Sequence, residues 1–191
     1  MRRSLPAAVL AAALTFATAA AQHSPPPSPY SGQQARNIKA LSDPEVADLL
    51  AGRGMGMARP AELNGYPGPM HVLELRDRLG LTPEQAAAVR ASFARMDAAA
   101  KPLGAELVER ERALDHAFAA RAVTPDALRA MTADIGGLQG RHRGVHLAAH
   151  VEMRAVLSDE QVRAYDALRG YSRAEGTPER HGGGGQHGRP H

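Results

Sequence analysis

The stretches Leu81-Thr82-Pro83-Glu84-Gln85 and Leu157-Ser158-Asp159-Glu160-Gln161 share one pattern, and they decide the fold. In each, a hydroxyl residue stands before a first helical turn, and a glutamine follows three positions later. The hydroxyl can accept a hydrogen bond from the third backbone N–H, and the glutamine can reach back to the N–H of the hydroxyl residue. Thr124-Pro125-Asp126 is a further start, with proline in the first turn, where a missing N–H costs nothing. The sequence therefore predicts a helix after each of these hydroxyl residues.

Between these starts the apolar residues follow helical spacing. From Val89 to Phe118, and again from Leu128 to Val156, they recur in steps of three and four, close to a heptad repeat. Because Arg121-Ala122-Val123 leaves room only for a turn, we expect the two long helices to form an antiparallel hairpin. Pro102 and Gly104, inside the first of them, predict a kink or a break.

Shorter helices are expected on both sides of the hairpin. Residues 41–68 combine a short helix, which Ser42 or Asp43 can cap, with an ordered loop rich in Gly, Met and Pro. The segment from Met70 to Leu79 predicts a further short helix, and the segment after the second motif predicts a last one. The expected fold class is therefore all-α, with a long antiparallel hairpin and short flanking helices forming one helical domain over residues 69–171.

The two ends of the chain differ from this helical region. Residues 1–21 join two arginines to a short apolar run with a small-residue end, the parts of a secretory signal peptide cleaved near Ala21. Pro6 and the scarcity of large apolar side chains make a membrane anchor the poorer interpretation. Residues 22–40 are rich in Pro and Ser, and residues 172–191 in Gly and His, so we expect a disordered spacer and a disordered tail. The expected location is the periplasm, with no membrane span after leader cleavage.

The composition argues against several classes of function. The sequence has no cysteine, so an exported chain of this kind has no disulfides and must be stabilised by packing alone. The formal net charge is +3, and the arginines alternate with acidic residues instead of forming a basic stripe with aromatic side chains, so nucleic acid is not an expected partner. No nucleophile elbow, phosphate-binding loop or HExxH motif occurs. We therefore expect neither an enzyme nor an organic cofactor.

The histidines of the second long helix suggest a metal site. His142, His146 and His150 repeat every four residues, and Met153 follows. Because side chains four apart share one side of a helix, His146 and His150 can chelate one ion, with Met153 as a thioether ligand and His71 as a further imidazole. Imidazole suits Zn, Cu and Ni, and a thioether adds preference for Cu(I). The alternative is that His142 is packed on the apolar stripe and that the other two are half-exposed surface residues.

Other candidates for metal binding lie outside the hairpin. The histidines of the tail can hold metal loosely or have no function. Cleavage after Ala20 would leave Ala21-Gln22-His23, whose free amine and imidazole can bind Cu(II) or Ni(II). Met55, Met57 and Met70 can extend a copper-binding surface, although adaptable packing or an apolar surface for clients is the interpretation that we favour.

The order of these features resembles that of the Spy/CpxP superfamily of periplasmic proteins, which is named for paired LTxxQ motifs. After the leader, a short helix, the first motif, a long hairpin, the second motif and a closing helix follow one another over residues 69–171. The first motif matches fully, and the second has Ser158 in place of threonine, which keeps the capping hydroxyl. Residues 152–157 and Ala164-Tyr165-Asp166 look closer to the heavy-metal resistance and sensor branch, the CnrX and ZraP kind, than to the chaperones.

The resemblance implies a four-helix hooked hairpin that forms a homodimer. Chaperone members hold unfolding clients without ATP, and metal members bind nickel, cobalt, copper or zinc, some of them regulating a sensor protein of the inner membrane. The nickel and cobalt sensors have a His-x-x-x-His pair before the first motif and a glutamate after it. Val72 and Arg76 stand at the positions of the two histidines and Phe93 at that of the glutamate, so this ligand pattern is not intact here. We therefore expect a heavy-metal-responsive binding protein with a rearranged site. The alternatives are a holdase chaperone for unfolded client proteins and an inhibitor of an envelope-stress sensor kinase.

Overall fold

The computed structural model describes residues 28–171. The chain divides into two units between Gln34 and Ala35. The described residues of the first unit form turns that lead into a 3-10 helix, η1 (Gln33–Ala35), which crosses this boundary. The proposed signal peptide, the beginning of the spacer and the histidine-containing tail lie outside the described residues.

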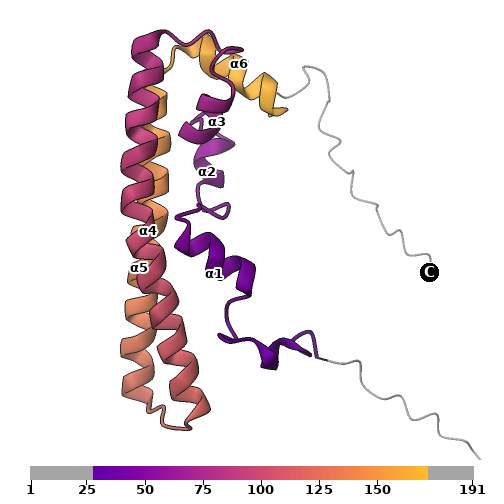
Figure 1. The fold of residues 1–191 in the computed structure, drawn as a ribbon, viewed down its shortest axis with the longest axis vertical. Helices are drawn as coiled ribbons and strands as arrows, with labels where there is room; N and C mark the ends of the chain where they lie inside the picture. The colour runs from indigo at the N-terminus through magenta and orange to yellow at the C-terminus, as the bar shows by residue number, and fades with distance from the viewer. Residues whose placement is uncertain (1–27, 172–191) are drawn as a thin grey trace, which may run out of the picture. The chain divides into compact units, whose positions relative to one another are not determined.

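The second unit is built from helices (Figure 1). In chain order they are α1 (Asp43–Leu50), α2 (Arg59–Glu62), α3 (Pro69–Glu74), α4 (Pro83–Ala119), α5 (Pro125–Val156) and α6 (Asp159–Arg169). Residues 28–171 contain no β-strand, which confirms the prediction of an all-α fold. No helix in that range has the length and apolar character that crossing a bilayer requires.

The two long helices, α4 and α5, lie side by side as an antiparallel hairpin (Figure 1). Their starts carry the expected hydrogen bonds. The Thr82 hydroxyl accepts from the Gln85 N–H at the start of α4, and the Ser158 hydroxyl accepts from the Gln161 N–H at the start of α6. Thr124 caps α5 in the same way. Local hydroxyl caps therefore set where each of these helices begins.

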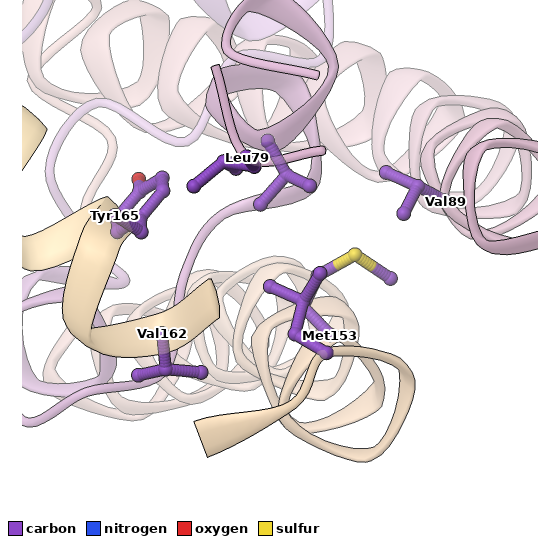
Figure 2. Packing of buried hydrophobic residues seen from close by; sticks show 7 residues of the cluster. Leu79, Val89, Met153, Val162 and Tyr165 are labelled. Atoms are coloured by element: carbon purple, nitrogen blue, oxygen red, sulfur yellow. The ribbon is translucent and has the colours of Figure 1, made fainter. Parts of the chain in front are cut away.

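Two apolar clusters pack the second unit. The first joins α3, α4, α5 and α6 through Val72, Leu79, Val89, Met153, Leu157, Val162 and Tyr165. Figure 2 shows the Met153 side chain pointing toward Val89 across the hairpin. The second cluster joins α1, α4 and α5 through Ile38, Leu49, Leu107, Val108, Ile135 and Leu138. The short helices α1, α3 and α6 are thus held on the hairpin by buried apolar side chains.

The segment expected to be a disordered spacer, residues 22–40, differs from that expectation at its C-terminal end. Ile38 is only 2% exposed and belongs to the second apolar cluster. The Lys39 ammonium lies 3.2 Å from a carboxylate oxygen of Asp115 on α4. The apolar area that Ile38 buries outweighs the polar composition around it, and composition alone does not show such a contact.

The long helix α4 is not broken at Pro102 or Gly104. Pro102 is exposed, so the carbonyl of Ala98 that loses its helical partner can be hydrated. Gly104 is buried under the end of α1, where an added Cβ atom would lie 2.0 Å from the Leu49 carbonyl oxygen. The glycine therefore allows α1 to contact the α4 backbone directly, and this contact explains its place inside a long helix.

The short helices begin and end at recognisable signals. Ser42, and not Asp43, caps α1, and it forms a complete capping box with Glu45. The helix expected from Met70 to Leu79 is shorter, because α3 ends at Glu74 and turns lead on to Gly80. Gly80 has a φ of 59°, in the left-handed region that glycine adopts without strain.

Candidate metal centre

A cavity of about 790 Å³ lies where the hairpin meets the segment that carries α2 and α3. His146 and His150 of α5 line it, and His71 of α3 lines it from the other side. Met153 is not among the described residues that line this cavity, because its fully buried side chain belongs to the first apolar cluster. The structure thus brings the predicted imidazoles to one space and places the predicted thioether in the core.

His150 is oriented by a hydrogen bond to the backbone. Its Nδ1 atom lies 2.7 Å from the Tyr66 carbonyl oxygen and 3.6 Å from a carboxylate oxygen of Glu62. Because a carbonyl oxygen can only accept, Nδ1 must carry the proton. The lone pair of the neutral ring is then on Nε2. Metal-binding histidines are commonly oriented in this way, with one ring N–H on a carbonyl or carboxylate and the other nitrogen on the metal.

His146 is buried with one of its ring nitrogens unpaired within the described residues. It is 4% exposed, and its Nε2 has no hydrogen-bond partner among residues 28–171. The backbone of Gly54 approaches the ring so closely that an added Cβ atom would lie 3.1 Å from Nδ1. Burial, with smaller contributions from His142 and His150, lowers the pKa of His146 to about 4. The ring is therefore neutral near pH 7, which is the form that binds metal.

The other two histidines of this region differ in accessibility. His71 is half-buried, and burial, followed by the charge of Arg169, lowers its pKa. His142 is fully buried on α5, with neither ring nitrogen hydrogen-bonded within the described part of the chain, and burial lowers its pKa. Its ring contacts that of His146 edge to face, with 5.0 Å between centroids. His142 therefore occupies a packing position next to the cavity.

Glu62, at the end of α2, contacts the candidate site and was not predicted from the sequence. One of its carboxylate oxygens accepts hydrogen bonds from the hydroxyls of Tyr165 (2.5 Å) and Tyr171 (3.2 Å), and the other accepts from the Gly68 N–H (3.1 Å). Burial, followed by the hydrogen bond to Glu62, raises the pKa of Tyr165, which keeps that hydroxyl a donor. The sequence does contain one signal for Glu62, because it is a lone carboxylate in a segment rich in Gly, Met and Pro.

The cavity fits a metal ion in its donor chemistry but does not present a closed ligand set. Within residues 28–171 no three His, Asp or Glu side chains lie close enough together to hold one ion. The fit rests on the buried Nε2 of His146 and on the Nδ1 hydrogen bond that sets the tautomer of His150. Binding therefore requires side chains to turn into the cavity or additional donors such as sulfur.

The paired capping motifs and the helical hairpin define an all-α hairpin protein with a cavity beside its short helices. Residues 46–164 match the model of a family described as heavy-metal resistance. Since the match covers more than half of the sequence, the chain belongs to the heavy-metal resistance family, and the resemblance seen in the sequence is confirmed. No curated protein and no solved structure matches the chain.

Proposed function

We propose that this protein is a periplasmic metal-binding protein that buffers or senses a late transition-metal ion in the cavity of the hairpin. Its membership of the heavy-metal resistance family supports this function. The observation that carries it is the His146 ring, which lines the cavity and whose buried Nε2 atom has no hydrogen-bond partner in the described chain. A buried unsatisfied nitrogen costs about 1–3 kcal/mol, and a metal ion would offset that cost.

His146 and His150 would hold the ion through ring nitrogens, and His71 would join them from α3. When bound, the ion would supply a positive charge that links the hairpin to the α2–α3 segment. Glu62 orients this region, because its carboxylate contacts both the His150 ring and the Gly68 backbone. Met153 stays a predicted ligand, but its sulfur would have to leave the apolar cluster to reach an ion.

Isothermal titration with Zn(II), Ni(II), Co(II), Cu(II) and Ag(I), which stands in for Cu(I), tests the proposal. Every sample should carry alanine at His181, His187 and His191, so that tail histidines do not contribute. We expect saturable binding of at least one ion, weakened by about tenfold or more in His146→Ala/His150→Ala. The matched control is His116→Ala, an exposed histidine in the last turn of α4, which should bind like the parent. Absence of heat from every ion, or unchanged binding in the double variant, would contradict the proposal.

A second candidate function is that of a holdase for unfolding proteins. The specific observation is a set of exposed large apolar side chains that gather between residues 50 and 70: Leu50, Met55, Leu63, Tyr66 and Met70. Exposed apolar groups of this kind can bind unfolded chains weakly. Suppression of the aggregation of a model client is the test, and Leu63→Ser/Tyr66→Ser should reduce it. Equal suppression by this variant would argue against a role for these side chains.

A further inference from the structure

Three methionines line the same cavity as the histidines, and they come from different parts of the chain. Met55 precedes α2, Met70 belongs to α3, and Met96 belongs to α4. Met55 is 42% exposed and Met70 is 47% exposed, whereas Met153 in the core is fully buried. A methionine that fills a gap in a core gives up its contact with water. The side chains of Met55 and Met70 therefore do not serve as core packing.

The backbone at Met55 supports a role for its side chain. Met55 has a φ of 46°, in the left-handed region, and stands between Gly54 and Gly56. An L-residue with a Cβ atom pays about 1–2 kcal/mol in this conformation, and glycine does not. Glycine stands on both sides of the position, whereas the position itself is occupied by methionine. The strain at Met55 therefore points to a function of the thioether at the cavity wall.

The oxygen donors of the cavity are already paired. The Asp48 carboxylate lies 3.0 Å from the Arg53 guanidinium, and the Asp97 carboxylate lies 2.6 Å from the Lys101 ammonium. Glu62 accepts hydrogen bonds from two tyrosine hydroxyls and one backbone N–H. A hard ion that needs carboxylate ligands would have to break these contacts. Imidazole nitrogen and thioether sulfur are the neutral donors that the cavity offers instead.

The charges along the cavity wall balance. The lining contains the carboxylates of Asp48, Glu62 and Asp97 and the guanidinium groups of Arg53, Arg59 and Arg169. A dication held by neutral donors among balanced charges would keep its full charge in a partly enclosed space, which is costly. A monovalent ion bears a smaller cost, because the desolvation free energy of an ion rises with its charge.

We propose that this cavity selects a soft monovalent ion of the Cu(I) class, with the thioethers of Met55 and Met70 as ligands beside the imidazoles of His146 and His150. Thioether ligands favour Cu(I) over the divalent ions that imidazole alone accepts. This inference rests on the proposed function, since it names the class of ion for the same site. Met96 supplies a third sulfur on the α4 wall.

The test compares Ag(I), a soft monovalent probe that keeps its oxidation state, with Zn(II) in chloride-free buffer. The full chain with alanine at the three tail histidines is the parent. We expect Met55→Leu/Met70→Leu to weaken Ag(I) binding by about tenfold or more and to change Zn(II) binding by less than about threefold. Leucine has a similar volume and no sulfur, and its side chain is branched and shorter. The matched control is Met57→Leu, two residues from Met55 and not among the described lining residues, which should leave both affinities unchanged.

A second measurement does not depend on the variants. In protein labelled at the methionine methyl carbons, Ag(I) should shift the Met55 and Met70 signals and leave those of Met57 and Met131 in place.

Ag(I) affinity that survives the double substitution, or an equal loss of Ag(I) and Zn(II) affinity, would overturn the inference. Binding of Zn(II) without Ag(I) would overturn it and leave the proposed function standing, whereas absence of binding by every ion of the titration would remove the proposed function itself.

Discussion

The side-chain amides of Gln85 and Gln161 are hydrogen-bonded to each other in both directions. Gln85 Nε2 donates to Gln161 Oε1 at 2.8 Å, and Gln161 Nε2 donates to Gln85 Oε1 at 3.0 Å. Each amide oxygen also accepts from the backbone N–H of its own cap residue, Thr82 or Ser158, and each amide nitrogen also donates to a backbone carbonyl. The two capping boxes therefore complete one another across the end of the hairpin.

Replacing Gln85 by alanine should lower the free energy of unfolding by about 2 kcal/mol, because it removes a capping bond and leaves the Gln161 amide half-satisfied. Urea denaturation measures this loss. In a double-mutant cycle with Gln161→Ala the combined loss should be smaller than the sum by about 1 kcal/mol, since both substitutions remove the same pair. Strictly additive losses would show that the two amides are not coupled in solution.

A side chain at position 104 should be poorly tolerated. Gly104→Ala would place a Cβ atom 2.0 Å from the Leu49 carbonyl oxygen, and that atom is backbone, so α1 must move away. We expect a loss of about 2 kcal/mol or more in thermal or urea unfolding, as for overpacked cores. Gly140→Ala on α5 is the control, because nothing described lies within 4 Å of its added Cβ atom. The control should gain up to about 1 kcal/mol from helix propensity, and a gain at both sites would contradict the close contact.

Loss of the Glu62 carboxylate should loosen the α2–α3 segment. Glu62→Ala leaves the hydroxyls of Tyr165 and Tyr171 and the Gly68 N–H without their acceptor. Hydrogen exchange at the Gly68 amide should accelerate by about tenfold or more, because this bond closes the loop. Glu106→Ala, which removes an exposed ion pair with Arg110 on α4, is the control and should leave that exchange unchanged. Unaltered exchange in Glu62→Ala would show that apolar packing alone holds the loop.

The stability of the protein without metal should fall as the pH is lowered. The pKa of His146 is lowered from its ordinary 6.5 to about 4 in the folded state, so between these values the unfolded state binds more protons and is favoured. From about pH 7 to about pH 5 this histidine alone should cost about 2 kcal/mol of unfolding free energy. His146→Gln removes the titration, so its fall over the same interval should be smaller by about that amount. An identical fall in both proteins would mean that His146 does not titrate with folding.

Local signals predicted much of the fold, because a helix N-cap depends only on residues that are close together in the sequence. Thr82, Thr124 and Ser158 each begin a helix through a bond to a residue three positions away. The features that were missed depend on contacts between distant residues. The burial of Ile38 against the hairpin and the contact between Gly104 and α1 have no signature in their own neighbourhoods.

The candidate site could likewise be predicted only in part. The spacing of His146 and His150 places both on one side of α5, and both line the cavity. Met153 follows one turn later, at the level where α6 packs, and its sulfur is enclosed by the side chains of the first apolar cluster. Glu62 could not be placed beside His150 from the sequence, because only the folding of the loop brings them together.

The contact between Gly104 and Leu49 also determines the register of α1 on the hairpin. Moving α1 by one turn along α4 would bring the Leu49 carbonyl over Ala100 or Val108, and each of these has a Cβ atom. Since the loop with Gly54 and Met55 follows α1 directly, a position without a side chain on α4 determines which loop atoms reach the histidines of α5. Any sequence change that slides α1 would therefore alter the lining of the cavity without replacing a histidine of the candidate site.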